Sequence, residues 1–320
     1  MEASERTSAP VPAIRLLGLR REFDGCTAVD DLTLDVGPGE IFGFIGPNGA
    51  GKTTTIRILA TLLDPTAGEA FLHGASIRDQ VDQVRRAIGY MPDQFGVYDG
   101  ITVEEYLDFF GAAFRIPAPQ RRRVVADVME LTDLGGLSGR MVSQLSQGMK
   151  QRLCLAKTLV HDPKVLILDE PASALDARAR IELRELLKEL RGMGKTIFIS
   201  SHILTELSDF CTSVGIIEKG RLIYQGTMDE IRRQRPAGTP MVVGLCREDP
   251  RAAVLLQAHP RVGDVEVRGT EVGFIYSGQA GDFHEVLKLL VDQGIPVLTV
   301  QEVPRTLEKL FLEVTRGHVQ

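Results

Sequence analysis

A glycine-rich segment near the N-terminus carries residues that could bind the phosphates of a nucleotide. It reads Gly46-Pro47-Asn48-Gly49-Ala50-Gly51-Lys52-Thr53-Thr54, which fits the pattern G-x-x-x-x-G-K-[ST]. Glycines let backbone N–H groups point at phosphate oxygens, and a helix that starts there adds partial positive charge. We predict that Lys52 reaches the β- and γ-phosphates and that the Thr53 hydroxyl binds Mg²⁺.

The neighbouring segments supply the strand and the helix that such a loop needs. The apolar run Ile41–Ile45 before the loop predicts a buried strand, and Thr53–Leu63 after it predicts a helix. A chance glycine-rich turn would lack this combination. Kinases, GTPases, helicases and transporters all share the loop, so the rest of the chain must distinguish among them.

Composition indicates a soluble globular protein of two domains. The chain has 320 residues, 43% of them hydrophobic and 25% charged, and a domain averages about 150 residues. The net charge of −6 argues against a nucleic-acid partner. The cysteines are too widely spaced for a disulfide framework or a zinc site: Cys26, Cys154, Cys211 and Cys246. No stretch reaches the roughly 18 apolar residues of a membrane-spanning helix.

Alternating strand and helix patterns predict an α/β domain over residues 14–234. The polar, proline-containing segment 1–13 before it is expected to be a disordered tail rather than a signal peptide. Two strands are expected around the turn Asp24-Gly25, and further strands and helices alternate up to the strand at 195–200. This order predicts a largely parallel sheet covered on both faces. Helical patterns at 103–114 and 120–131 interrupt it and predict a helical insertion over about 94–145.

A smaller α+β domain is predicted after the proline- and glycine-containing linker 235–240. Its strand and helix patterns follow the order β-α-β-β-α-β over residues 241–303, with a hairpin at Gly269, and a further helix at 307–315. That order is typical of the ferredoxin-like fold. The predicted domain spans 241–320.

Several short motifs, in a consistent order, resemble those of the ATP-binding cassette (ABC) family. Leu145–Met149 resembles its L-S-G-G-Q signature with two substitutions, and Val165–Glu170 resembles its Walker B strand. Ser173–Asp176 resembles its D-loop and Ser200–His202 its switch histidine. The resemblance extends from about residue 14 to 225 and implies an α/β P-loop ATPase that binds ATP and Mg²⁺.

The resemblance gives individual residues a role in catalysis. Asp169 is expected to hold Mg²⁺ through water, and Glu170 to act on the attacking water as a general base. His202 is expected to hydrogen-bond the γ-phosphate and the water, although a histidine after a strand can also be structural. Phe23 stands where the family places an aromatic ring against adenine, and its alternative role is in the apolar core.

The signature motif implies a second copy of the chain. Ser146, Gln147 and Gly148 offer a hydroxyl and free N–H groups at a helix start, which suits an anion. The family uses this element in trans, on ATP held by the phosphate loop of the other subunit. The resemblance therefore implies a homodimer that encloses two ATP–Mg²⁺.

One position departs from the family pattern. The family places Gln after a Tyr-x-Pro strand end, whereas this chain reads Tyr90-Met91-Pro92-Asp93-Gln94. Asp93 falls on the Gln position, and a carboxylate can also bind Mg²⁺. A one-residue shift would put Gln94 there instead, so both remain candidates for the metal.

Weaker similarities point to bacterial exporters with separate membrane subunits, including drug-resistance and sodium-extrusion ATPases. They are carried by Ile88–Asp93, Gly96–Tyr98, Glu104–Leu107 and Leu307–Leu312. They imply an ATPase at the cytoplasmic side of the membrane that drives a permease, with a C-terminal domain that is regulatory, a subunit contact or a structural lid. The alternatives are a soluble ABC ATPase in translation or DNA repair and a P-loop small-molecule kinase. The first usually has tandem cassettes or coiled coils, and the second would not require the signature or His202.

Overall fold

The computed structural model describes residues 11–94, 96–98, 100–173, 175–207, 209–233 and 238–302. It divides into two compact units, Met1–Asp229 and Glu230–Gln320. Each has its own cluster of buried apolar side chains. The expected tail lies largely outside the described residues, but Ala13 is buried and its N–H donates to the Val36 carbonyl at 2.8 Å. The expected helix at 307–315 also lies outside them.

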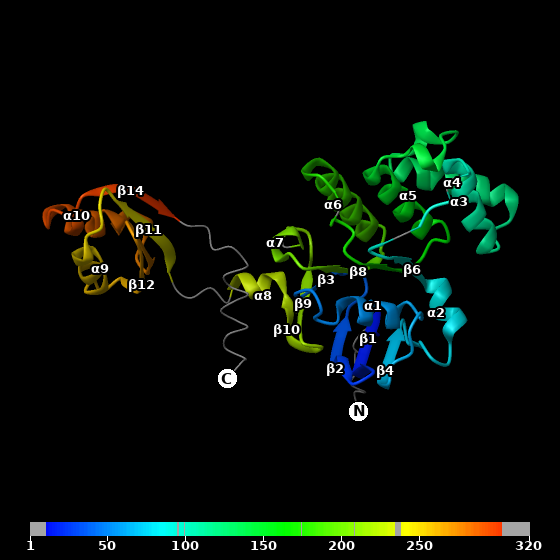
Figure 1. Ribbon diagram of the computed structural model, residues 1–320, viewed down its shortest axis with the longest axis horizontal. Helices are drawn as coiled ribbons and strands as arrows, with labels where there is room; N and C mark the ends of the chain where they lie inside the picture. The colour runs from blue at the N-terminus through cyan, green and yellow to red at the C-terminus, as the bar shows by residue number, and fades with distance from the viewer. Residues whose placement is uncertain are drawn as a thin grey trace, which may run out of the picture. The chain divides into compact units, whose positions relative to one another are not determined.

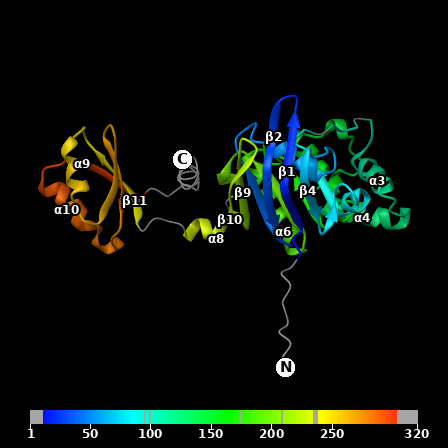
Figure 2. The same ribbon diagram turned by 90° about the horizontal axis from the view of Figure 1, so that it is seen from below.

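The first strands form an antiparallel sheet of their own, in the order β2-β1-β4-β5. Figure 2 shows β2, β1 and β4 side by side in one layer. The strands are β1 (Ile14–Phe23), β2 (Cys26–Val36), β4 (Ala67–Leu72) and β5 (Ala75–Ser76). The predicted turn at Asp24-Gly25 joins β1 to β2, with positive φ at both residues. The strand patterns predict these strands, but they do not reveal that the strands form a separate sheet.

A second sheet carries the elements that build the site, in the order β10-β9-β3-β8-β7-β6. Its strands are β3 (Ile41–Ile45), β6 (Ile88–Met91), β7 (Val165–Leu168), β8 (Thr196–Ser201), β9 (Ser213–Glu218) and β10 (Arg221–Thr227). All neighbours pair in parallel except β10, which is antiparallel to β9. Every residue of β3, β7 and β8 is buried, as expected for strands covered on both faces. The predicted largely parallel sheet is therefore confirmed for this layer.

Helices cover the second sheet on both faces (Figure 1). Helix α1 (Lys52–Leu59) contributes Ile56 and Ile58 to one buried cluster with Leu16 of the first sheet and Phe44 of the second, so it packs between the sheets. The opposite face carries α5 (Gln147–Leu159) and α6 (Ala177–Gly192). The shorter helices are α2 (Val81–Ala87), α7 (Leu204–Leu207) and α8 (Met228–Arg233).

The helical insertion consists of α3 (Val103–Ala113) and α4 (Ala118–Leu131), followed by the short 3₁₀ turns η1 (Gly135–Leu137) and η2 (Val142–Gln144). A capping box starts α3: Glu105 N–H donates to Thr102 Oγ1 at 3.3 Å, and the Glu105 carboxylate accepts from Thr102 N–H at 2.8 Å. Pro119 lies in the first turn of α4, where its missing N–H costs nothing, so α4 begins two residues earlier than predicted.

The C-terminal unit contains an antiparallel sheet in the order β12-β13-β11-β14. Its elements are β11 (Thr239–Leu245), α9 (Pro250–Gln257), β12 (Val262–Arg268), β13 (Glu271–Tyr276), η3 (Ala280–Phe283), α10 (His284–Asp292) and β14 (Val297–Glu302). Val243 and Phe274 from the sheet share a core with Leu256 of α9 and Leu290 of α10. Within the described ranges of both units, no helix is long and apolar enough to cross a membrane.

Candidate functional site

The glycine-rich loop runs from the end of β3 to the start of α1 and leaves no room for side chains at two glycines. A Cβ on Gly46 would lie 2.3 Å from the Ile217 carbonyl oxygen of β9. Gly51 caps α1 in the left-handed region at φ 106°, and a Cβ there would lie 2.4 Å from the Ala28 carbonyl oxygen. The fold therefore requires glycine at both positions, and the loop is fixed against β2 and β9.

Lys52, the first residue of α1, is buried and bonded to the loop itself. Its Nζ donates to the Gly46 carbonyl at 2.7 Å and to the Pro47 carbonyl at 3.3 Å. It also lies 3.3 Å from Glu170 Oε1, and only 6% of its side chain is exposed. A buried ammonium needs such partners, and a phosphate could replace the two carbonyls.

Asp169 follows β7 and is 1% exposed. Burial raises the pKa of its carboxyl, while hydrogen bonds from Ser200 and Thr53 lower it and the charges of Asp93 and Glu170 raise it further. Ser200 Oγ donates to Asp169 Oδ1 at 2.7 Å. The carboxylate thus lies near the Thr53 hydroxyl, in surroundings where a divalent cation would offset the negative charge.

The oxygen donors of Thr53, Asp169 and Asp93 fit a hard cation such as Mg²⁺. Among the described residues, no three His, Cys, Asp or Glu side chains come together closely enough to hold a metal by themselves. That arrangement suits an ion that keeps waters and takes phosphate oxygens as further ligands.

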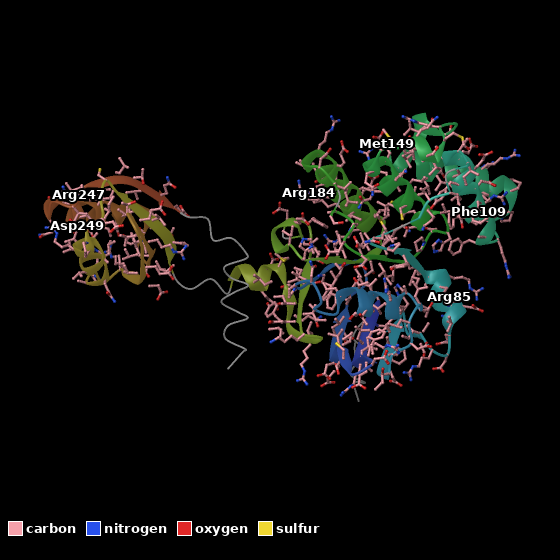
Figure 3. All side chains as sticks on the ribbon, in the orientation of Figure 1. Arg85, Phe109, Met149, Arg184, Arg247 and Asp249 are labelled. Carbon is pink, nitrogen blue, oxygen red and sulfur yellow. The ribbon has the colours of Figure 1, made fainter. Side chains whose placement is uncertain are left out.

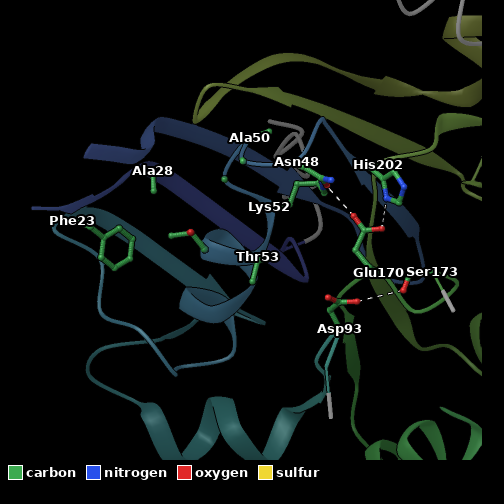
Figure 4. Close-up of a pocket in the computed structure, with 13 residues that line it drawn as sticks. Phe23, Ala28, Asn48, Ala50, Lys52, Thr53, Asp93, Glu170, Ser173 and His202 are labelled. Carbon is green, nitrogen blue, oxygen red and sulfur yellow. Dashed lines mark hydrogen bonds and ion pairs between the residues drawn. The ribbon is translucent and has the colours of Figure 1, made fainter. Parts of the chain in front are cut away.

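Glu170 connects the phosphate loop to His202. It has a left-handed backbone (φ 48°), which is unusual for a residue other than glycine, and its side chain is 14% exposed. One carboxylate oxygen faces Lys52, and the other lies 2.8 Å from His202 Nδ1. Figure 4 shows Glu170 between Lys52 and His202. Glu170 and His202 follow the adjacent strands β7 and β8, and Lys52 begins α1 at the end of the loop after β3, so these three predicted site residues lie together.

A cavity of about 540 Å³ opens beside these groups, within the size range of ligand pockets. Its lining comprises Phe23, Ala28, Asn48, Gly49, Ala50, Gly51, Lys52, Thr53, Thr54, Asp93, Glu170, Ser173 and His202. Phe23 is 41% exposed and its ring lies 4.4 Å from the Arg21 guanidinium carbon, so it is not a core residue. Figure 4 shows it at the end of the cavity away from Glu170.

Asp93, not Gln94, lines the cavity. Ser173 Oγ lies 3.4 Å from Asp93 Oδ1, and Gln94 is exposed outside the lining. In sequence, Ser173 is only the first residue of the D-loop motif and Ser200 the first of the switch-histidine motif. The structure adds that the Ser200 hydroxyl also accepts from Glu170 N–H at 2.9 Å. The available signal for Ser200 was a polar residue directly after the apolar run Ile197–Ile199 of a predicted strand.

Ser146, Gln147 and Gly148 do not join the other predicted residues. They lie at the start of α5, where Ser146 Oγ accepts from Met149 N–H at 3.3 Å as an N-cap. None of the three lines the cavity, and Ser146 and Gln147 are exposed. Figure 3 labels Met149, which lies in the first turn of this helix. One chain therefore presents the phosphate loop and the signature at separate places.

Comparisons with known proteins show what this chain is similar to. A family model described as ABC transporter matches residues 29–173. Nod factor export ATP-binding protein I of Paraburkholderia xenovorans (strain LB400) is 36% identical, over 97% of this chain and 99% of its own length. The bacitracin transport ATP-binding protein BcrA of Bacillus licheniformis is 34% identical, over 95% and 97%. A solved structure of an ATP-binding subunit of an ABC transporter is 30% identical, with a TM-score of 0.64, over 69% of this chain and 92% of that chain.

Proposed function

Because this chain belongs to the ABC transporter family as an ATP-hydrolysing subunit of the export type, we propose that two copies close on two ATP molecules and drive a separate permease. The proposal rests on one observation above all. Glu170 is fixed between Lys52 of the phosphate loop and His202 at the cavity, where the γ-phosphate of a bound nucleotide would lie.

ATP binding uses groups that are already in place. The triphosphate lies on backbone N–H groups of the loop after Pro47, residues 48–54, and Lys52 exchanges the Gly46 and Pro47 carbonyls for phosphate oxygens. Phe23 offers its exposed ring to the adenine at the other end of the cavity. The roughly 540 Å³ of space supports a ligand of nucleotide size.

Mg²⁺ would be held by Thr53 and Asp169, with Asp93 facing it from the segment after β6. When bound, it would withdraw charge from the β- and γ-phosphates. The chain's own part is to fix these oxygens: Ser200 and Thr53 both hydrogen-bond Asp169. Asp93 in place of the family's Gln adds a negative charge at this point.

Hydrolysis needs a group that takes a proton from the attacking water. Glu170 accepts it while the oxygen bonds to the γ-phosphorus, and the bond from that phosphorus to the ADP oxygen breaks. His202, hydrogen-bonded to Glu170, donates to the γ-phosphate or the water and orients both. Lys52 balances the charge that develops on the phosphate oxygens.

The separation of the signature from the phosphate loop supports a composite site between two copies. Ser146 and the N–H groups after it form an exposed helix start that does not line the nucleotide cavity of its own chain. Docked on a second copy, they would contact the γ-phosphate held there. ATP then favours the closed dimer, and hydrolysis favours opening.

The helical insertion is the proposed docking surface for the permease. Tyr98 is 58% and Phe109 51% exposed, and their rings lie 5.8 Å apart on its surface. Figure 3 shows Phe109 at the outer side of the insertion. Exposed aromatic side chains are typical of binding surfaces. Docking would hold the chain at the cytoplasmic side of the membrane. A soluble ABC ATPase of translation or DNA repair is the alternative.

We also propose that the C-terminal unit has the ferredoxin-like fold. Its element order β-α-β-β-α-β and its strand order β12-β13-β11-β14 support this.

The test of the catalytic proposal is Glu170→Gln, which keeps the shape but removes the base. We expect ATP binding to persist and hydrolysis to fall about 10²–10⁴-fold. The variant should then accumulate as an ATP-bound dimer on gel filtration. Hydrolysis at the wild-type rate would remove Glu170 from the mechanism.

A further inference from the structure

The turn after β7 holds Glu170 in a backbone conformation that does not form by itself. Glu170 has φ 48°, in the left-handed region, and the residue after it is Pro171. L-residues rarely adopt that conformation, and a following proline restricts the backbone further. The direction of the Glu170 carboxylate therefore depends on groups that fix the peptide bonds on either side.

Hydrogen bonds from two other elements fix this turn. Before it, Glu170 N–H donates to Ser200 Oγ of β8 at 2.9 Å. After it, the Gln151 side-chain amide of α5 donates Nε2–H to the Pro171 carbonyl. Within the turn, Ser173 N–H donates to the Glu170 carbonyl at 3.2 Å. Among these residues, Gln151 is the one that lies on α5, the helix that begins at the signature motif.

Gln151 is an unusual residue for its surroundings. It is 6% exposed, and among the described residues its Oε1 is buried without a hydrogen-bond partner. An apolar residue of similar length would avoid that unpaired oxygen, because buried polar groups are normally satisfied. The stability of the fold therefore gives little reason for a glutamine at this position. The hydrogen bond from its Nε2 to the Pro171 carbonyl gives a better one.

We propose that Gln151 is a positioning residue for hydrolysis, which holds the Pro171 carbonyl and thereby keeps the Glu170 carboxylate directed at the cavity. The inference rests on the proposed role of Glu170. Gln151 itself does not line the cavity, so it acts only through the turn. It lies one helical turn beyond Gly148, and a Cβ on Gly148 would be 3.8 Å from Leu175 Cδ2, so α5 and the segment after Glu170 pack together.

This contact connects two ATP sites in one chain. Ser146 caps α5 and is proposed to act on the ATP of the second copy, whereas Glu170 acts on the chain's own ATP. A helix moves as a rigid element, so a shift of its start on the partner's phosphate would move Gln151 and the Pro171 carbonyl with it. Arg152, the next residue, also connects α5 to α6 through its ion pair with Glu182.

The experiment is a double-mutant cycle between Gln151→Met and Glu170→Gln, read by single-turnover hydrolysis of γ-labelled ATP. Methionine keeps the length of glutamine without its amide. In the wild-type background, Gln151→Met should slow hydrolysis about 10–100-fold, because a small misplacement of a catalytic group costs that much. ATP affinity should stay within about twofold, since no cavity group changes. In the Glu170→Gln background, Gln151→Met should have no further effect.

Lys157→Met is the matched control on the same helix. Its ammonium lies over the Phe110 ring at 5.2 Å, outside the site, so hydrolysis should stay at the wild-type rate. Equal losses from Gln151→Met in both backgrounds would indicate general damage to the fold and overturn the proposal alone, as would an unchanged rate in the wild-type background. Wild-type hydrolysis by Glu170→Gln by itself would overturn the base assignment as well, so the two failures are distinct.

Discussion

Glu170 Oε2 and His202 Nδ1 lie 2.8 Å apart although the residues are 32 positions apart in sequence. They meet because β7 and β8 pair in parallel, with Leu168 opposite Ile199, so that the residues following both strands lie at the same edge of the sheet. The same pairing places Ser200 against Asp169. Strand order, rather than distance along the chain, therefore assembles the hydrolytic groups beside the phosphate loop.

Lys52→Ala should weaken ATP binding about 10–100-fold, the equivalent of one charge-assisted hydrogen bond. The variant removes the buried ammonium that faces both the loop and Glu170. Isothermal titration with ATP measures the effect. The control is Lys188→Ala, which removes an exposed lysine that pairs with Glu185 at the surface of α6 and should bind like wild type. Equal affinities for both variants would refute the phosphate-loop role.

Asp93→Gln should raise the Mg²⁺ concentration needed for half-maximal turnover severalfold, because an amide oxygen binds Mg²⁺ more weakly than a carboxylate. Gln94→Ala is the matched control and should leave the Mg²⁺ dependence unchanged, since Gln94 lies outside the cavity lining. Mg²⁺ titrations of ATPase rate measure both. If only Gln94→Ala shifts the curve, Gln94 is the residue that faces the metal.

Phe109→Ser and Glu104→Lys should each reduce the amount of protein that a co-expressed permease retains in salt-washed membranes. Both side chains are exposed on α3, away from the nucleotide cavity, so basal ATPase activity should not change. Glu105 is unsuitable for this test because its carboxylate caps α3. Unchanged retention by both variants would rule out this docking surface.

The Glu105 cap itself depends on pH. Hydrogen bonds from Thr102 lower the pKa of the Glu105 carboxyl, so its contribution to the cap is lost as pH falls through the lowered value.

The sequence predicts the local elements of the site better than the contacts between distant segments that surround them. The runs Ile41–Ile45 and Val165–Leu168 are apolar throughout, which is typical of buried parallel strands, and both are completely buried. The phosphate loop can be recognised from its own residues together with the strand before it and the helix after it. These local signals survive folding because the strand, the loop and the helix are consecutive in the chain.

Other features depend on contacts between distant segments and leave little local signal. Strand β3 pairs with β8 and β9, more than 150 residues away in sequence, and nothing in its uniformly apolar sequence specifies those partners. The predicted α1 was too long: it ends at Leu59, because Thr61 takes a left-handed backbone at φ 57°. Ser200 and Gln151 have ordinary polar side chains in sequence, and their partners appear only when β8 and α5 pack against the turn after β7.

The composite site between two copies is the central claim, and ATP turnover in mixtures of two inactive variants tests it most directly. Ser146→Arg should bind ATP but disable the composite site to which it contributes the signature. Lys52→Ala should leave its own site largely empty at an ATP concentration between the dissociation constants of wild type and variant. A mixed dimer regains one intact site, formed by the loop of the first chain and the signature of the second. We predict that turnover rises above that of either variant alone and peaks near equal amounts. Full turnover by Ser146→Arg alone, or no gain on mixing, would contradict the account.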